Sequence, residues 1–172
     1  MQNDGYSGSS IWIHWLTALA VVALFVTHEG SRDSAAWAFH VGGGAIIGLF
    51  LLWRVFRRLA RGSTTKPQQA PVLNIIATSV IWCLLLLIVV ITVTGYLLPW
   101  SLGQPLDVYG LMIPSPLPVS RGVHEFSEQL HDAAGHIIIL LVILHSLGTL
   151  KHAIFDKDGV ATRIFKAKSG GK

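Results

Sequence analysis

Residues 72–98 read VLNIIATSVIWCLLLLIVVITVTGYLL, without a single Asp, Glu, Lys or Arg. A helix needs about 20 apolar residues to cross the hydrocarbon core of a bilayer, so this stretch is long enough for one crossing. The whole chain has the same character, because it is 52% hydrophobic and only 13% charged. The composition therefore predicts an integral membrane protein and excludes an ordinary soluble domain.

Three further apolar runs lie around this stretch, at Ile11–Thr27, Ala35–Trp53 and Ala133–Leu150. The first follows a polar start without a basic segment or a cleavage signal, so we expect it to be a retained helix. Four crossings leave little of the 172 residues for anything else, and we predict one domain, 1–172. The predicted fold is an all-α, four-helix transmembrane bundle with helices at residues 11–28, 35–58, 72–98 and 123–154.

The segment between the last two helices, Pro99–Gly122, holds five of the seven prolines. Proline disrupts helices, so this segment is predicted to be an irregular cap rather than another crossing. Ser120 is suited to cap the helix that follows.

The basic residues predict the orientation. Eleven of the thirteen Lys and Arg lie either between Arg54 and Lys66 or from Lys151 onward. The opposite loops hold two basic residues and six acidic ones. The positive-inside rule then places both termini in the cytoplasm, and it explains the net charge of +4 without a nucleic-acid partner.

The single cysteine limits how a redox cofactor could be bound. Cys83 is the only cysteine, so the chain has no internal disulfide and no C-x-x-C-H motif for covalent haem attachment. Any redox cofactor must be bound without a covalent link to cysteine.

Eight histidines are many for this length, and most lie in or beside the apolar runs. Ionisable side chains are costly inside a membrane and usually face the bundle interior. A neutral imidazole is the usual axial ligand of b-type haem, and one histidine from each of two facing helices can hold the macrocycle. At the predicted cytoplasmic end, His14 and His145 pair by elimination.

The interval from His131 to His145 spans about four turns of an α-helix. It returns to within about 40° of the same face and rises about 21 Å, which suits two stacked haems. His136 falls on the opposite side by the same count and is set aside.

The partner of His131 is either His28 or His40. His28 follows His14 by that same interval, so spacing alone allows it. We favour His40, because it opens the stretch HVGGG and the glycines up to Gly44 would let a flat macrocycle approach the backbone. Arg54 follows His40 by the same interval again, which puts it on the same face at the predicted cytoplasmic end. Its guanidinium could pair there with the propionates of the haem at that end.

Two alternative assignments fit the histidines less well. Interior histidines bonded to carbonyls would not explain four of them at two depths with a repeated interval. A zinc site would need three or four ligands at one level. We expect no redox role for His28, His124 and His136.

These residues resemble the bacterial cytochrome b561 family, which includes superoxide oxidase. The resemblance lies in His14-Trp15, HVGGG followed by WRVFRRLAR, the pair His131 and His145, and the ending LHSLGTLKHAIFDKDG. It implies a bacterial inner-membrane protein with two non-covalent b haems, whose axial ligands are His14, His40, His131 and His145.

The resemblance also implies an activity. Relatives of the superoxide oxidase type oxidise superoxide at the outer side of the membrane and reduce ubiquinone. In these relatives a histidine and a loop lysine lie near the quinone, and the corresponding residues here are His152 and Lys66. His152 is about equally well explained as a surface histidine. The third helix lacks the histidines of those relatives, and the outer loops are acidic.

We therefore expect an oxidoreductase that moves electrons between an outer-face donor and the quinone pool. Its expected partners are membrane lipid, quinone and superoxide. The alternative is a membrane-anchor cytochrome b subunit that accepts electrons from a partner dehydrogenase or hydrogenase docked on the acidic outer face.

Overall fold

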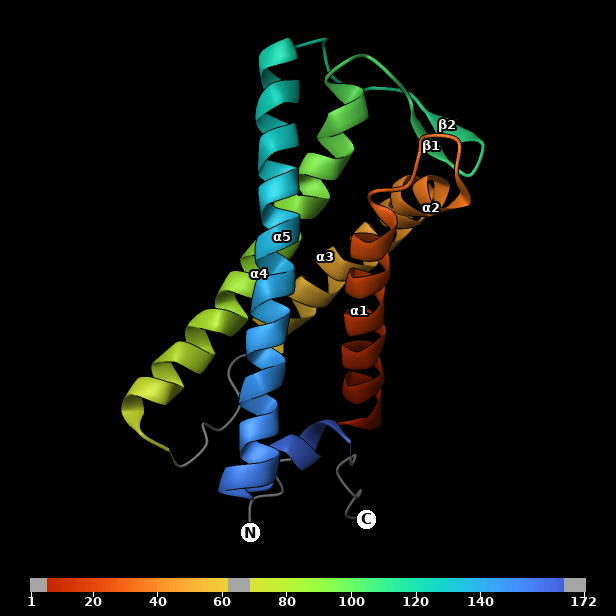
Figure 1. Cartoon of the computed structure of the whole chain (residues 1–172). Coiled ribbons are helices and arrows are strands. Elements are labelled where there is room, and N and C mark those ends of the chain that lie inside the picture. The colour runs from red at the N-terminus through yellow and green to blue at the C-terminus, as the bar shows by residue number, and fades with distance from the viewer. Residues whose placement is uncertain (1–5, 62–68, 166–172) are drawn as a thin grey trace.

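The computed structural model describes residues 6–61 and 69–165, and in them four helices are long and apolar enough to cross a membrane. The crossings lie at Gly8–Thr27, Ala35–Ala60, Pro71–Trp100 and Arg121–Asp156. Each predicted crossing overlies one of these helices, so the predicted four-helix membrane bundle is confirmed (Figure 1).

The helices divide into shorter elements where the backbone changes type. The long helices are α1 (Gly8–Thr27), α3 (Gly44–Arg61), α4 (Pro71–Trp100) and α5 (Arg121–Lys151). The second crossing begins with α2 (Ala35–Ala38) and a π-helical turn, η1 (Phe39–Gly43); the fourth ends in a second π-helical turn, η2 (His152–Asp156), followed by the 3-10 helix η3 (Ala161–Ile164).

The bundle has two distinct ends. The terminal end is where α1 begins and η3 lies, and the hairpin end carries strands β1 (Leu106–Val108) and β2 (Leu111–Ile113) (Figure 1). The indole N–H of Trp15 in α1 donates to the Ile164 carbonyl at 3.1 Å, so the two extremities of the described chain meet at the terminal end.

Hydroxyl caps and a proline fix three helix starts. Ser34 accepts from the Trp37 amide, and Ser120 accepts from the Val123 amide as predicted. Each cap satisfies a backbone donor that has no partner inside the helix. Pro71 occupies the first turn of α4, where a missing N–H costs nothing.

The apolar core lies between α3 and α4. Leu51 and Val55 of α3 pack against Leu85 and Ile88 of α4. Closer to the hairpin end, the Tyr96 hydroxyl of α4 donates to the Ala45 carbonyl of α3. These contacts give α3 and α4 a shared face that is independent of the histidines.

Gly48 allows α3 and α4 to approach each other. A Cβ at this position would lie 2.8 Å from Cγ2 of Thr92, a β-branched side chain whose hydroxyl is bonded to the Ile88 carbonyl. We expect Gly48→Ala to lower the free energy of unfolding by about 1–3 kcal/mol, because Thr92 or the helix pair must shift. Thermal unfolding followed by circular dichroism in detergent measures it.

Gly148→Ala is the matched control, since nothing lies within 4 Å of a Cβ there. Alanine favours a helix over glycine by about 1 kcal/mol, so this variant should be at least as stable as the parent. Equal midpoints for both variants would contradict the close approach at Gly48.

The segment Pro99–Gly122 is less irregular than predicted. Leu106 pairs with Ile113 and Val108 with Leu111, so the cap contains a two-stranded antiparallel hairpin. Its turn residues Tyr109 and Gly110 have φ values of 54° and 91°. Positive φ at both central residues is typical of the tight turn that matches strand twist, which is why a short hairpin closes here despite the prolines.

Tyr109 seats the hairpin on the second crossing. A Cβ on Gly42 would lie 3.1 Å from the Tyr109 nitrogen, and one on Gly43 would lie 2.9 Å from its hydroxyl oxygen. The space beside two glycines of HVGGG is thus occupied by the hairpin. Gly44 faces Leu24, whose Cδ2 would lie 3.6 Å from an added Cβ.

Candidate functional site

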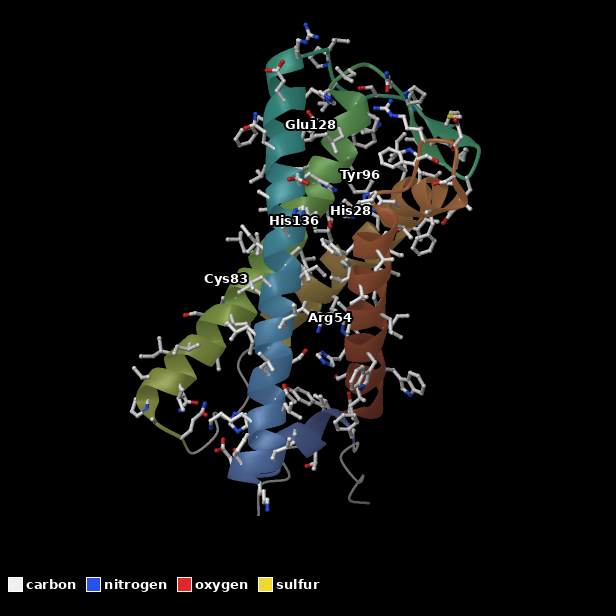
Figure 2. The ribbon with its side chains drawn as sticks, viewed as in Figure 1. His28, Arg54, Cys83, Tyr96, Glu128 and His136 are labelled. Carbon is white, nitrogen blue, oxygen red and sulfur yellow. The ribbon has the colours of Figure 1, made fainter. Side chains whose placement is uncertain are left out.

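Six of the histidines form two groups at two depths, between α1, the second crossing and α5. At the terminal end, the rings of His14 and His145 have centroids 6.2 Å apart and planes inclined at 65°. Arg54 of α3 lies beside this pair, with Nη2 3.5 Å from His14 Nδ1 (Figure 2). The structure thus brings together three residues that the sequence placed at one depth.

At the hairpin end, His40 of η1 faces His131 of α5. Their ring centroids are 6.1 Å apart and their planes are nearly perpendicular, at 85°. The repeated interval along α5 therefore does place His131 and His145 toward partners on the same side of that helix.

Hydrogen bonds orient both rings of the hairpin-end pair. His40 Nδ1 lies 2.9 Å from the Leu24 carbonyl, which can only accept, so Nδ1 carries the proton. His131 Nδ1 lies 3.1 Å from Oγ1 of Thr94, whose own hydrogen is donated to the Val90 carbonyl at 2.8 Å. Each ring is therefore left with an unprotonated Nε2, the form that binds a metal.

The two pairs fit the dimensions of a bis-histidine haem site. With metal–nitrogen bonds of about 2 Å and about 1 Å from each nitrogen to its ring centre, two axial imidazoles lie about 6 Å apart, centre to centre. The observed centroid separations are 6.2 and 6.1 Å. The donor set, neutral imidazole on both sides, is that of b-type haem.

A further contact was not expected from the sequence. His136 was predicted to point away from the face of the fourth helix that carries His131 and His145. Its ring lies 6.1 Å from that of His28, and both rings contact Phe25 (Figure 2). His28 also lies 6.4 Å from His40. The spacing of residues along α5 gives directions only around that helix, and no sequence signal showed that the end of α1 would approach its exposed side.

The pair His28 and His136 differs from the pair His40 and His131 in its hydrogen bonds. His136 is bonded to the Asp132 carbonyl of its own helix at 3.0 Å, and its side chain is 60% exposed. His28 Nδ1 contacts the Phe25 carbonyl one turn back. Neither ring has a hydrogen bond to a neighbouring helix among the described residues, in contrast to His40 and His131.

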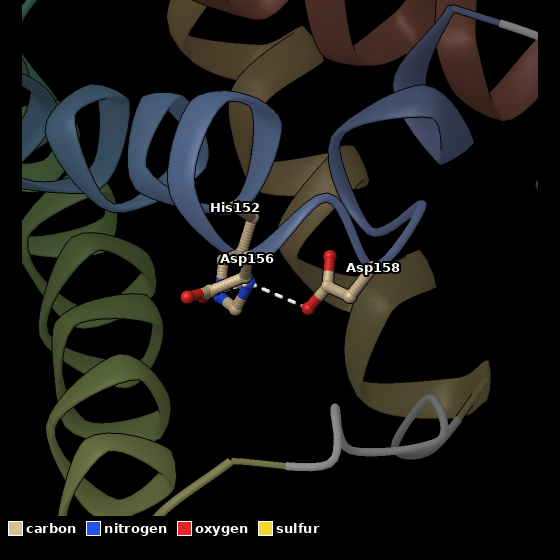
Figure 3. Close-up of side chains that lie close together, drawn as sticks. All are labelled: His152, Asp156 and Asp158. Atoms are coloured by element: carbon tan, nitrogen blue, oxygen red, sulfur yellow. Dashed lines mark hydrogen bonds and ion pairs between the residues drawn. The ribbon is translucent and has the colours of Figure 1, made fainter.

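The terminal end carries a cluster outside these pairs, His152, Asp156 and Asp158 (Figure 3). Nδ1 of His152 lies 2.7 Å from Oδ2 of Asp158 and 3.1 Å from Oδ2 of Asp156. Lys151 forms an ion pair with Asp156. Lys66, the other predicted quinone contact, lies outside the described residues.

The Asp158 carboxyl is held in its ionised form. Desolvation acts to raise its pKa, but hydrogen bonds from the Val160 amide and from His152 outweigh this and leave the pKa below the ordinary value. The amide contact is 3.0 Å long. Asp158 is therefore an acceptor for His152 at neutral pH.

His124 lies at the hairpin end, away from both pairs. Its Nδ1 is 3.1 Å from the Leu98 carbonyl and 3.3 Å from the Ser101 hydroxyl. These contacts join the end of α4 to the start of α5.

The chain is similar to known proteins along nearly its whole length. A family model described as prokaryotic cytochrome b561 matches residues 5–167. Cytochrome b561 homolog 2 of Escherichia coli strain K12 is 26% identical over 177 residues, which cover 96% of this chain and 94% of that protein. The family match includes all four crossings and both histidine pairs.

Proposed function

The chain belongs to the prokaryotic cytochrome b561 family, whose members are membrane proteins that bind haem b and transfer electrons, and from this membership we propose that it passes electrons across a bacterial inner membrane through two b-type haems. One haem is held by His14 and His145 at the terminal end, and the other by His40 and His131 at the hairpin end. The observation that supports this most directly is the pair of ring separations, 6.2 and 6.1 Å.

The haem irons supply the one-electron chemistry, and the chain sets the conditions for it. Leu24 and Thr94 hold the rings of His40 and His131 with Nε2 free. This arrangement fixes the ligand orientation before the cofactor arrives, which favours tight binding.

Arg54 is assigned to the propionates of the terminal-end haem. No carboxylate among residues 6–61 and 69–165 forms an ion pair with it, although it lies within a membrane crossing. A cation at such a position usually pairs with an anion or with backbone carbonyls. Propionates beside His14 would provide the anion, and a guanidinium can bind a carboxylate through two hydrogen bonds.

Removal of this charge should lower the midpoint potential of the terminal-end haem. A positive charge nearby stabilises the reduced, less positive iron, so Arg54→Gln should lower the potential by roughly 50–100 mV. A spectroscopic redox titration measures this. Arg57→Gln is the control, because the Arg57 guanidinium stacks on Trp53, 4.8 Å from the ring centre, rather than beside a histidine; its potentials should be unchanged.

Quinone is proposed to bind at the terminal end, next to His152 and Lys66, with superoxide as the donor at the hairpin end. The orientation follows from the charge distribution, with both termini cytoplasmic and the hairpin outside. Electrons would then enter at the pair His40 and His131 and leave from the pair His14 and His145.

The charge of the hairpin end favours a second candidate function. Glu125 and Glu128 lie in the second turn of α5, and Figure 2 shows Glu128 near the hairpin end. The nearby Arg121 is ion-paired with Glu125 at 3.7 Å. Superoxide is an anion that an acidic rim would repel, whereas a basic soluble dehydrogenase or hydrogenase subunit would be attracted. In that case the chain is a membrane-anchor cytochrome subunit.

One experiment separates the two functions. Pyridine-haemochrome analysis and a reduced-minus-oxidised spectrum of detergent-purified protein give the haem type and number; superoxide and then a soluble ubiquinone are added in the same cuvette. Two b haems that superoxide reduces and quinone reoxidises support the superoxide:ubiquinone oxidoreductase. Two haems that stay oxidised with superoxide support the anchor subunit, and a colourless protein would refute both.

A further inference from the structure

The cluster at the end of α5 is formed by a reversal of the chain. Lys157, which follows η2, has a left-handed φ of 50°, and Gly159 has a φ of 76°. The chain therefore turns back on His152, so that Asp158 faces the ring that begins η2 (Figure 3). Residues 157–165, the C-terminal strap, continue from this turn to α1.

The ring of His152 is held by one nitrogen. Its side chain is only 11% exposed, and both carboxylates lie beside Nδ1, at 2.7 Å for Asp158 and 3.1 Å for Asp156. A carboxylate accepts and does not donate, so Nδ1 carries a proton. Nε2 is the ring nitrogen that these carboxylates leave available to a bound molecule.

Asp158 is better placed than Asp156 to hold the ring. It is closer to Nδ1, whereas Asp156 is also ion-paired with Lys151. The other charged groups on this turn and on the adjoining η3 are Lys157 and Arg163. Asp158 therefore makes the shorter of the two carboxylate contacts with His152, on a turn that carries both acidic and basic side chains.

We propose that Asp158 is a positioning residue of the quinone site, which holds His152 so that Nε2 exchanges protons with the quinone oxygen. This inference rests on the proposed function, in which quinone binds at His152. A carboxylate that holds a histidine by Nδ1 fixes the tautomer and orientation of a general acid or base.

Reduction of a quinone requires a source of protons. A quinone becomes a quinol when it gains two electrons, delivered one at a time from the haem path, and two protons. For each proton, the Nε2–H bond of a doubly protonated His152 breaks and an O–H bond forms on the quinone, while the Nδ1–H bond to Asp158 is kept. Nε2 regains its proton from the solution between the two transfers.

The test is stopped-flow reoxidation of dithionite-reduced protein by a short-chain ubiquinone, over a series of pH values. Asp158→Asn should lower the reoxidation rate at least about tenfold and change its pH dependence, because general acid catalysis through His152 is lost. Haem content and reduced spectra should stay as in the parent. Asp158→Glu, which keeps the carboxylate, should recover much of the rate.

Thr162→Val is the matched control in the C-terminal strap. The Thr162 hydroxyl donates to the Gly159 carbonyl at 2.7 Å, so this change loosens the same turn without touching His152. It should keep the parental rate and pH profile. An equal loss in Thr162→Val would overturn the proposal, because the effect would then come from the fold of the strap.

His152→Ala separates this inference from the proposed function. If His152→Ala is slow and Asp158→Asn is as fast as the parent at every pH, the quinone site stands and the role of Asp158 is refuted. If His152→Ala reoxidises normally, the quinone site itself is wrong and both proposals fail. Loss of the parental rate with EDTA and recovery with zinc would also overturn the proposal, because the cluster would then be a metal site.

Discussion

Alanine at His14 or at His145 removes the terminal-end haem and leaves the hairpin-end haem in place; this is the largest effect we expect. Haem content should fall from two to one per chain, since a single axial imidazole left opposite alanine cannot replace a bis-histidine clamp. Pyridine-haemochrome quantification measures the content, and a redox titration identifies which potential has disappeared. Alanine at His40 or His131 should remove the other haem by the same reasoning.

The pair His28 and His136, which we do not assign as ligands, provides the control. His28 and His136 have a ring separation of 6.1 Å, so distance alone does not exclude them as ligands. They lack the interhelical hydrogen bonds that orient His40 and His131 among the described residues. His28→Ala and His136→Ala should therefore retain both haems. Loss of the hairpin-end haem in His28→Ala would overturn the choice of His40, and two normal haems in any of the four ligand variants would refute that ligand.

The features that depend on helix length, on spacing along one helix or on depth in the membrane could be predicted from the sequence. Hydrophobic length located the four crossings, and an interval of about four helical turns placed His131 and His145 on one side of α5. Depth in the membrane then selected His14 as the neighbour of His145. Such predictions succeed because a membrane helix has a fixed rise and must satisfy its own backbone hydrogen bonds.

The features that were missed depend on contacts between elements or on local departures from an α-helix. The π-helical turn Phe39–Gly43 includes His40 and the three residues that follow it, so a count at about 100° per residue does not give the true direction of His40 relative to Arg54. The seating of Tyr109 on Gly42 and Gly43 requires a hairpin that formed in a proline-rich segment. The sequence also did not show that a turn after η2 brings the Asp158 carboxylate to His152.

Substitution of Gly95 should give the second large effect, because it tests the position of the His131 ring without changing any histidine. A Cβ on Gly95 would lie 3.1 Å from Cε1 and 3.5 Å from Nδ1 of His131. The adjacent Thr94 holds that Nδ1, so the ring cannot move away without losing its hydrogen bond. Gly95→Leu should therefore displace His131 and lower occupancy of the hairpin-end haem by about 10–100-fold, while the terminal-end haem remains.

Graded substitutions make this result specific. Gly95→Ala requires a shift of only a few tenths of an ångström, and should weaken the hairpin-end haem less than leucine does. Gly135→Ala on α5 is the control, since its Cβ would meet Ile91 at an ordinary 3.6 Å; it should keep both haems. Haem content and the redox titration read out all three variants. Two parental haems in Gly95→Leu would mean that His131 has room to move and that its present position does not define the haem site.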